Sequence, residues 1–329
     1  MRLFFSVKDI HSIRDLVDEA FSIKQSPYKF QDLGKNKTLG LVFLNPSLRT
    51  RLSTQKAALN LGMNVMVMNM DKEGWALETR DGVVMNGSTV EHIREAAAVM
   101  GEYCDILGLR CFPKLQDRDE DYSEDLFNKF VKFCGIPVVS LESATLHPLQ
   151  SLADLITIIE HSPSTLERVG VRAKVVLTWA PHVKPLPQSV PNSFSEWMCR
   201  ARQEGLIDFV ITHPEGYELA EEFTIGSNIT HNQNEALQNA DFVYVKNWSS
   251  YREYGEILTD GEGWMIDNEK LKQTNNAKIM HCLPVRRDLE LSSEILDGPS
   301  SLVTQEAGNR VWAAQVILKR MLEGKSYGK

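Results

Sequence analysis

The sequence predicts an α/β fold of two domains, each with a parallel sheet flanked by helices. Short runs of aliphatic and β-branched residues alternate with segments whose apolar residues recur at helical spacing. Such alternation is typical of βα units around a parallel sheet. The chain has 329 residues, about twice the usual length of a domain, and the alternation restarts midway. We therefore expect two α/β domains of similar size.

The first series of expected elements lies between residues 38 and 142. Its apolar runs are short and β-rich, which favours strands. The intervening segments are richer in Ala and charged residues and carry apolar side chains at helical spacing, which favours helices. The expected strands are 38–44, 64–70, 105–110 and 137–142, and the expected helices are 49–61, 91–100 and 124–133.

The second series follows a helical stretch at 149–160 and a polar loop at 161–164, in which Pro163 is a helix breaker. The last segment, 305–322, has apolar residues at helical spacing, so we expect a long amphipathic helix at the end. The expected strands between these helices are 174–179, 208–212, 241–246 and 277–282.

Charge and hydropathy exclude several classes of protein. Lys plus Arg is 36 and Asp plus Glu is 44, a net charge of −8, which gives no overall field to attract nucleic acid or an anionic membrane. No apolar run approaches the roughly 18 residues of a membrane span, and charge interrupts the N-terminal segment before it forms a signal-peptide core. Five widely spaced cysteines argue against a disulfide framework or a zinc knuckle. We expect a cytoplasmic protein with neither nucleic-acid nor membrane partners.

Familiar cofactor motifs are missing from the sequence as well. It contains no P-loop, G-x-G-x-x-G or H-E-x-x-H pattern. Nucleotide cofactors and zinc therefore lack their usual sequence support, and any bound anion must be held by local groups.

The segment 44–51, Leu-Asn-Pro-Ser-Leu-Arg-Thr-Arg, lies where a strand ends and a helix begins. Free backbone N–H groups and the helix dipole favour an anion there. Ser47 and Thr50 add hydroxyl donors, and Arg49 adds a planar guanidinium. Ser47 as an ordinary helix N-cap beside surface arginines is an equally good interpretation of this segment alone.

The segment 142–154 again runs from a strand end into a helix, with Pro148 suited to the first helical turn. His147 precedes that helix and Gln150 lies one turn along it, so both can reach one small polar ligand. A lone histidine is more often structural. The location at the carboxyl end of a strand, where open α/β sheets bind ligands, favours function here.

Two further segments are ambiguous by themselves. Cys282, in His-Cys-Leu-Pro at 281–284, can be a nucleophile, a polar contact or a buried small side chain, and the buried interpretation starts ahead. Arg310, in Gln-Glu-Ala-Gly-Asn-Arg at 305–310, would alone be a solvated helix residue.

Taken in order, the four segments resemble the aspartate/ornithine carbamoyltransferase family over essentially the whole chain. Any one motif is weak, but four in the right order make an accidental match very improbable. The family patterns S-T-R-T-R, H-P-x-Q-x-x-x-D, H-C-L-P and E-x-x-N-R read here as Ser47-Leu48-Arg49-Thr50-Arg51, His147-Pro148-Leu149-Gln150 through Asp154, His281-Cys282-Leu283-Pro284, and Glu306 with Asn309 and Arg310.

The resemblance implies a carbamoyl-phosphate domain at residues 1–147, joined by the returning C-terminal helix 305–329, and an amino-acid domain at 148–304. It also implies a homotrimer with active sites at subunit boundaries. The implied carbamoyl-phosphate contacts are Ser47, Leu48, Arg49, Thr50, Trp75 (from a neighbouring subunit), Arg110, His147, Gln150, Cys282, Leu283 and Arg310. Of these, Thr50, Arg110, His147 and Cys282 are the implied catalytic residues.

The implied reaction is attack of an unprotonated δ-amine on the carbonyl carbon of carbamoyl phosphate. Thr50, Arg110 and His147 are expected to stabilise the negative charge that develops on the carbonyl oxygen. Phosphate then leaves, taking the amine's proton. No metal or cofactor is expected in this reaction.

One departure from the ornithine enzymes concerns the substrate. The family pattern D-x-W-x-S-M-G, which binds the free α-amino and α-carboxylate groups of ornithine, is replaced by Lys246-Asn247-Trp248-Ser249-Ser250. A lysine repels an α-ammonium group and suits a substrate whose α-nitrogen is acylated. The chain thus resembles the acylornithine branch, which implies Glu142, His182, Lys246 and Arg286 as substrate contacts.

Val90 bears on the acyl group. Acetyl-type enzymes of this branch have a glutamate at that place and succinyl-type enzymes a proline. A glutamate would repel a succinyl carboxylate, and valine removes that repulsion. Together with segments such as 60–65 and 182–187, which look closer to the succinyl type, this favours N-succinylornithine as the substrate. The alternatives are N-acetylornithine, ornithine or a diamine well behind it, and a non-catalytic anion-binding regulatory homologue.

Overall fold

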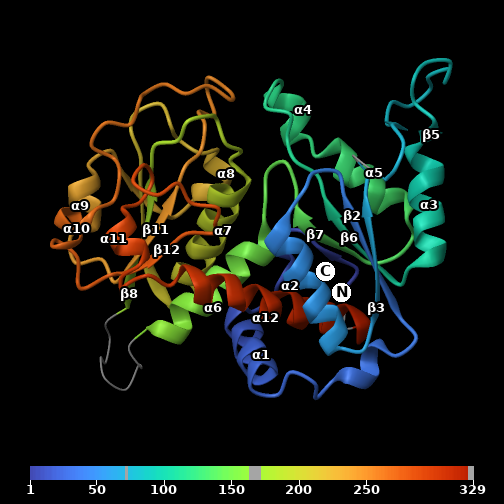
Figure 1. Ribbon diagram of the computed structural model, residues 1–329, viewed down its shortest axis with the longest axis horizontal. Helices are drawn as coiled ribbons and strands as arrows, with labels where there is room; N and C mark the ends of the chain where they lie inside the picture. The colour runs from blue at the N-terminus through green and yellow to red at the C-terminus, as the bar shows by residue number, and fades with distance from the viewer. Residues whose placement is uncertain (71–72, 163–171, 325–329) are drawn as a thin grey trace. The chain divides into compact units, whose positions relative to one another are not determined.

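The computed structural model describes residues 1–70, 73–162 and 172–324, which form two compact units (Figure 1). The first contains Met1–Lys114, Asp119–Leu149 and Arg310–Lys329, and the second Leu115–Arg118 and Gln150–Asn309. Apart from the short segment Leu115–Arg118, the chain passes between the units inside two helices, α6 (Pro148–His161) and α12 (Val303–Leu322). Because α12 ends in the unit where the chain began, the expected return of the last helix is confirmed. Pro163 and Ser164 of the expected loop lie outside the described residues.

The first unit is built on a five-stranded parallel sheet of order β1-β7-β6-β2-β3. All four expected strands are present. The central strands β6 and β7 are buried along their whole length, as a sheet covered on both faces requires. The strands are β1 (Leu3–Phe4), β2 (Thr38–Phe43), β3 (Asn64–Asn69), β6 (Ile106–Arg110) and β7 (Val138–Glu142).

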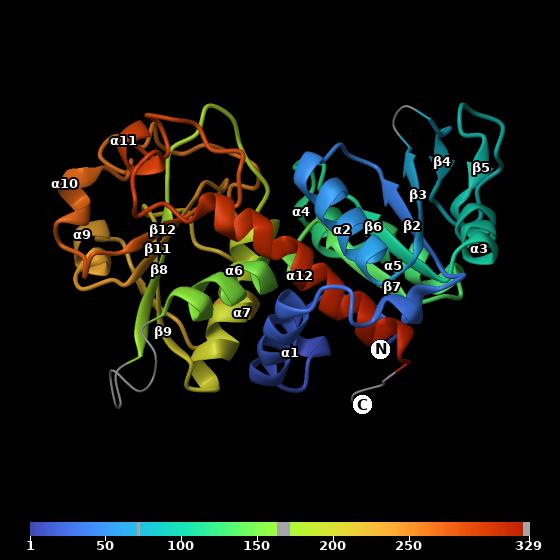
Figure 2. The ribbon, with the colours of Figure 1, turned by 60° about the horizontal axis from the view of Figure 1, so that its bottom comes forward.

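Helices α1 (Ile13–Gln25), α2 (Leu48–Asn60), α3 (Ile93–Tyr103), α4 (Arg118–Tyr122) and α5 (Asp125–Phe133) accompany this sheet, with short 3-10 turns at Val7–Asp9 and Gln31–Gly34. The helix expected from residue 91 begins two residues later. Its first residues form β5 (Glu91–His92), which pairs with β4 (Leu77–Glu78) beside α3 (Figure 2).

The part of α12 in the first unit is fixed by buried polar contacts. Asn60 Nδ2 of α2 donates to Gln315 Oε1 at 2.8 Å, and Lys319 Nζ pairs with Glu19 of α1 at 2.8 Å. Both interactions link residues more than 250 positions apart in sequence. The last helix is thus an integral part of the first unit.

The second unit has a parallel sheet of order β10-β9-β8-β11-β12. Its strands are β8 (Ala173–Trp179), β9 (Ile207–Thr212), β10 (Asn228–Thr230), β11 (Phe242–Lys246) and β12 (Lys278–Met280), and its further helices are α7 (Ser189–Gln203), α8 (Glu221–Thr224), α9 (Gln233–Leu237), α10 (Asn268–Leu271) and α11 (Ser293–Leu296). The strand expected at 277–282 ends at Met280 because the next amide, His281 N, donates to Glu306 Oε2 at 2.8 Å.

In a parallel sheet the carboxyl ends of all strands meet at one edge, where open α/β folds bind ligands. The implied site residues follow β2, β6 and β7 in the first unit and β8, β11 and β12 in the second. None of the helices described is both long and apolar enough to cross a membrane.

Candidate active site

The start of α2 presents the first group of implied anion contacts. Ser47 is the N-cap, with extended backbone (φ −154°), yet its side chain makes no capping hydrogen bond to the helix. The interpretation of Ser47 as an ordinary cap is therefore not realised. Thr50 is buried and Leu48 is 69% exposed, so the first turn of α2 combines a buried hydroxyl with accessible backbone. The N–H groups and the dipole at the start of a helix favour an anion.

Arg310 of α12 reaches this turn. Its Nη2 donates to Thr50 Oγ1 at 2.5 Å, and both side chains are buried. Taken by itself in the sequence, Arg310 would be a solvated helix residue. The return of the last helix places its guanidinium at the anion-binding turn instead.

Arg110, Glu142 and His147 form a second buried group in the same unit. Arg110 ends β6 and donates to the Glu142 carboxylate, which ends β7. A shift of register after Leu109 sets Arg110 opposite Glu142, as a β-bulge does when it redirects a side chain. His147 Nε2 lies 3.4 Å from Glu142 Oε2.

His147 is held in its neutral form. Burial lowers the pKa of His147 well below its ordinary value. Three neighbouring guanidinium groups lower this pKa further, and they belong to Arg310, Arg110 and Arg49. One carboxylate, that of Glu142, lies among these cations. The group therefore retains positive charge around a neutral imidazole, which is the electrostatic requirement of a phosphate site.

Glu124, which precedes α5, holds the loop that leads to His147. Its carboxylate accepts hydrogen bonds from Ser143 Oγ at 2.6 Å, Thr145 N at 2.7 Å and Thr145 Oγ1 at 2.6 Å. Glu124 is itself buried and adopts a left-handed backbone conformation (φ 52°). Sequence reasoning missed this residue because no motif links it to the loop it holds, which lies about 20 positions away.

In the second unit, Gln150 belongs to a buried polar network. Gln150 Nε2 donates to Asp154 Oδ1 at 2.7 Å and to Glu306 Oε1 at 3.2 Å. Glu306 in turn accepts from His281 N at 2.8 Å. The network thus fixes the chain just before Cys282.

The Cys282 thiol is not a nucleophile at neutral pH. Burial raises the pKa of Cys282 to about 11, although the nearby Lys246 acts to lower it. A protonated thiol is a weak nucleophile and a weak hydrogen-bond partner. Of the three interpretations that the sequence left open, only the polar contact and the buried small side chain remain.

Leu283 adopts a left-handed backbone conformation (φ 57°) that non-glycine residues rarely use. Its N–H donates to His281 Nδ1 at 2.8 Å. Backbone strain of this kind gathers at ligand sites.

The implied substrate contacts of the second unit lie together. Arg286 Nε donates to His182 Nε2 at 3.0 Å, so the neutral ring carries its hydrogen on Nδ1, 2.8 Å from the Lys184 carbonyl oxygen. Burial lowers the pKa of His182, and Lys246 and Arg286 lower it further. Lys246 Nζ donates to Asn247 O at 3.0 Å.

Glu290, which sequence reasoning also missed, is the buried carboxylate beside these basic groups. It accepts from Arg286 N at 2.7 Å and lies 3.5 Å from His281 Nε2. Burial alone would raise the pKa of Glu290, but a hydrogen bond from the His281 side chain and the charge of Lys246 help to hold that pKa below its ordinary value. With one carboxylate against the cations Lys246 and Arg286, this group suits a substrate that carries carboxylates.

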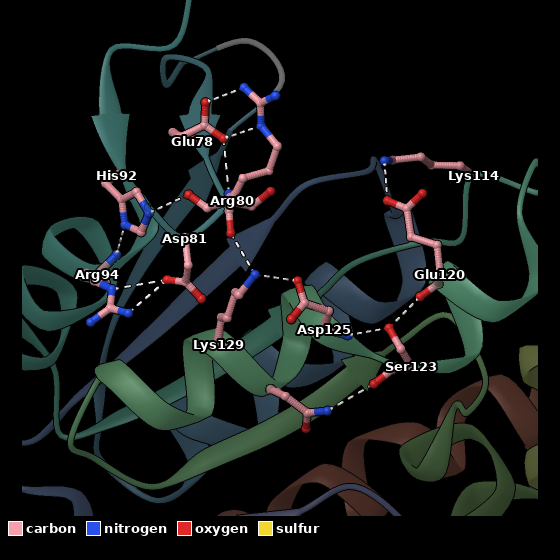
Figure 3. A network of polar contacts seen from close by, with 12 residues as sticks. Glu78, Arg80, Asp81, His92, Arg94, Lys114, Glu120, Ser123, Asp125 and Lys129 are labelled. Carbon is pink, nitrogen blue, oxygen red and sulfur yellow. Dashed lines mark hydrogen bonds and ion pairs between the residues drawn. The ribbon is translucent and has the colours of Figure 1, made fainter. Parts of the chain in front are cut away.

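Trp75 and Val90 lie apart from these groups, at the small sheet of β4 and β5. Trp75 is 55% exposed and its Nε1 donates to Glu91 Oε2 at 2.9 Å; Val90 is 65% exposed and its N donates to Ala76 O at 2.9 Å. Figure 3 shows the polar contacts that tie the loop after β4 to α3 and α5, among them Arg94 to Asp81 at 2.8 Å and Lys129 to Thr79 O at 2.6 Å. Both side chains are thus exposed on either side of this loop, Trp75 just before β4 and Val90 just before β5.

Comparison with known proteins gives the same family as the sequence motifs. Residues 2–160 match the family model "Aspartate/ornithine carbamoyltransferase, carbamoyl-P binding domain", and residues 200–321 match "Aspartate/ornithine carbamoyltransferase, Asp/Orn binding domain". The chain is 50% identical over 326 residues to the N-succinylornithine carbamoyltransferase of Bacteroides thetaiotaomicron, covering 98% of this chain and 99% of that one. It is 34% identical over 311 residues to the N-acetylornithine carbamoyltransferase of Xylella fastidiosa, covering 88% and 90%.

Solved structures agree. A glutamate-to-valine variant of N-acetyl-L-ornithine transcarbamylase, complexed with carbamyl phosphate and N-succinyl-L-norvaline, has a TM-score of 0.87 and 31% identity, covering 98% of this chain and 100% of that one. A further variant of N-acetyl-L-ornithine transcarbamylase, complexed with PALAO, has a TM-score of 0.88 and 30% identity, covering 98% of this chain and 100% of that one. The chain belongs to the aspartate/ornithine carbamoyltransferase family.

Proposed function

We propose that this protein transfers the carbamoyl group of carbamoyl phosphate to the δ-amine of N2-succinyl-L-ornithine. The products are N-succinyl-L-citrulline and phosphate, and the step belongs to arginine biosynthesis. The observation that carries the proposal is the cluster of the buried Arg110 and Arg310 and the half-buried Arg49 around the neutral His147. This cluster supplies what a doubly charged phosphate and a developing oxyanion require.

The first unit would hold carbamoyl phosphate. Ser47, Leu48 (by its backbone), Arg49 and Thr50 would bind the phosphate at the start of α2, and Gln150, Cys282 and Leu283 would lie against the carbamoyl group. The carbonyl oxygen would face Thr50, Arg110 and His147. A neutral imidazole serves as a hydrogen-bond donor there and does not protonate the incoming amine, which attacks through its free lone pair.

In the reaction, the lone pair of the δ-amine forms the new C–N bond and the carbonyl oxygen takes the π electrons. The bond from carbon to the phosphate oxygen then breaks, and phosphate leaves with the proton that the amine loses. The protein's part is to orient the two reactants and to stabilise the oxyanion.

The second unit would hold the acylated amino acid. Lys246 and Arg286 pair with substrate carboxylates, while His182 orients the Arg286 guanidinium through its hydrogen bond. Glu142, at the end of β7, is the further contact that the resemblance implies. A cation at position 246 repels an unmodified α-ammonium group, which supports an acylated substrate.

Two observations favour succinyl over acetyl. The chain is 50% identical to a named N-succinylornithine carbamoyltransferase and 34% identical to a named N-acetylornithine carbamoyltransferase. In the solved acetyl-type variants, replacing one glutamate by valine or proline accompanies bound N-succinyl-L-norvaline. Val90 would provide the same lack of negative charge in this chain. N-acetylornithine is the second candidate substrate, and retention of the whole charged cluster disfavours a non-catalytic homologue.

We also propose a homotrimer in which Trp75 and Val90 enter a neighbour's site. Their exposure beside the paired strands β4 and β5 supports this role. A cytoplasmic location is supported by the free state of all five cysteines, since the cytosol keeps thiols reduced. Light scattering of the purified protein tests the trimer.

The experiment that tests the function compares kcat/KM for N-succinylornithine, N-acetylornithine and ornithine at saturating carbamoyl phosphate, measured as ureido product. We expect clear preference for N-succinylornithine. Preference for N-acetylornithine would overturn the interpretation of Val90 alone, and activity only with ornithine would overturn the substrate assignment. Absence of any turnover with all three would favour the non-catalytic homologue.

A further inference from the structure

A cluster outside the proposed active-site groups has the composition of a metal site. One ring nitrogen each of His213 and His231 and one carboxylate oxygen of Glu218 lie within 4.8 Å of one another. His213 is buried, Glu218 half-buried and His231 exposed. Two imidazoles and a carboxylate are ligands that Zn²⁺ and related divalent transition metals accept.

The fold brings the two histidines together. His213 directly follows β9 and His231 directly follows β10, and these strands are parallel, with Thr212 in register with Thr230. Residues that follow register partners emerge side by side at the sheet edge. The two rings have centroids 5.0 Å apart. Glu218 comes from the loop between β9 and α8.

Hydrogen bonds fix which ring nitrogens are available. His213 Nδ1 lies 2.8 Å from Pro214 O, and His231 Nδ1 lies 3.0 Å from His213 O. A carbonyl oxygen only accepts, so each Nδ1 carries the hydrogen and each Nε2 keeps its lone pair. Metal-bound histidines are oriented in this way, with the second nitrogen donating to a carbonyl or carboxylate.

Two buried atoms of this cluster lack a hydrogen-bond partner among the described residues. They are Nε2 of His213, whose side chain is 99% buried, and Oε2 of Glu218. The other oxygen, Glu218 Oε1, accepts from Gly216 N at 3.3 Å. Buried polar atoms are nearly always paired, so an acceptor nitrogen and a carboxylate oxygen left unpaired together indicate a cation.

We propose that His213, Glu218 and His231 bind one divalent transition metal, with zinc as the best match. This site departs from the expectation that no metal is present, and the metal takes no part in carbamoyl transfer. Tetrahedral zinc with bonds of about 2.1 Å needs donors about 3.4 Å apart. The exposed His231 side chain can close the remaining distance, and its exposure leaves the fourth position to water.

The metal would stabilise the loop 213–218. Trp248 Nε1 donates to Tyr217 O at 2.8 Å, and Ser250 Oγ donates to Gly216 O at 2.8 Å. These two donors follow Lys246 closely in sequence, so the loop supports the segment that carries the proposed substrate lysine. Binding of metal to the folded state alone would therefore raise thermal stability.

The test uses the full chain, dialysed against chelator and then against buffer with Zn²⁺ or Co²⁺. The variants His231→Gln and Glu218→Gln remove one ligand each, and neither position is fully buried, so both variants should fold. Matched controls are Glu215→Gln, an exposed glutamate of the same loop, and His11→Gln, an exposed histidine of the first unit.

We expect about one equivalent of metal per chain by elemental analysis in the parent and in both controls. With Co²⁺ we expect visible absorption bands typical of a four-coordinate metal with nitrogen and oxygen ligands. Adding Zn²⁺ should raise the melting temperature. All three signals should be lost in the two ligand variants. Absence of metal binding by the parent, or binding that both ligand variants retain, would overturn the proposal.

Discussion

The Arg310 guanidinium and the Thr50 hydroxyl are joined by a hydrogen bond of 2.5 Å across 260 positions of sequence. One comes from the last helix and the other from the first turn of α2. This contact aligns a cation with the anion-binding turn before any substrate arrives, and the neighbouring contact of Asn60 with Gln315 fixes the helix that delivers it. Such preorganisation is what electrostatic catalysis depends on.

Replacing Arg310 by lysine should lower kcat/KM by about 100-fold, since a point charge cannot reproduce the planar guanidinium at a buried site. The control is Arg320→Lys on the same helix, where Arg320 pairs with Glu19 at 2.8 Å. That variant should lose some stability and keep its activity. Steady-state kinetics and thermal melts of both variants separate the two effects, and equal activity loss in both would contradict the role given to Arg310.

The pH dependence of stability should report on His147. Burial and three guanidinium groups hold the pKa of His147 well below its ordinary value. Below about pH 6.5, His147 is therefore protonated in the unfolded chain but stays neutral in the folded chain. The free energy of unfolding therefore falls as pH drops through that value.

In His147→Gln this contribution is absent. Urea unfolding at about pH 7.5 and about pH 5.5 should show a smaller loss of stability than in the parent. Burial lowers the pKa of His213 as well, so His213→Gln should also flatten the dependence. An unchanged loss in His147→Gln would show that His147 is already protonated in the folded protein.

Lys246→Asp should reverse the charge that selects the substrate. We expect kcat/KM for N-succinylornithine to fall by about 100-fold or more, because a carboxylate replaces the cation that pairs with the substrate carboxylate. Lys272→Asp, at an exposed lysine paired with Glu269, is the charge-matched control. Turnover of N-succinylornithine that is unaffected by the change at 246 would remove the charge argument.

Val90→Glu should shift the acyl preference. A glutamate would face the succinyl carboxylate, so kcat/KM for N-succinylornithine should fall by about 10- to 100-fold while that for N-acetylornithine changes little. Val84→Glu, at another exposed valine of the same loop, controls for added charge. A parallel loss with both substrates would place position 90 outside acyl recognition.

The elements that the sequence predicts well are those with a strong local pattern. β2, β6 and β11 are continuous apolar runs and lie within two residues of their expected bounds. Strand β1 is not predicted because Leu3–Phe4 is only two residues long. Helix α7 is not predicted because Pro191 resembles a helix breaker, although proline is tolerated in the first turn of a helix, where Pro191 lies.

The residues of the candidate site also divide into those with a local sequence pattern and those without one. Residues such as Arg49 and His147 stand in motifs with fixed spacing, so one sequence is enough to single them out. Glu124, Glu290 and His213 act through partners that only the fold brings near, and irregular spacing gives no local signal for them. Their functions depend on tertiary contacts, which the sequence does not display.

Glu124→Gln tests one of these hidden contacts. Oε1 of the carboxylate accepts from Ser143 Oγ, Thr145 N and Thr145 Oγ1, and Oε2 accepts from Ala144 N at 3.4 Å. A glutamine keeps one acceptor oxygen, places an amide that cannot accept against Ala144 N, and removes the charge that strengthens the other bonds. We expect a loss of about 1–3 kcal/mol in the free energy of unfolding, the usual cost of unpairing buried polar groups.

Because Glu124 orders the loop before His147, the Glu124→Gln variant should also have a lower kcat. Its KM for N-succinylornithine should change less, since the second unit is proposed to bind that substrate. Glu120→Gln, at an exposed glutamate paired with Lys114 at 2.7 Å (Figure 3), should leave both kinetic constants unchanged. If Glu124→Gln is destabilised but turns over normally when folded, Glu124 supports the fold without positioning His147.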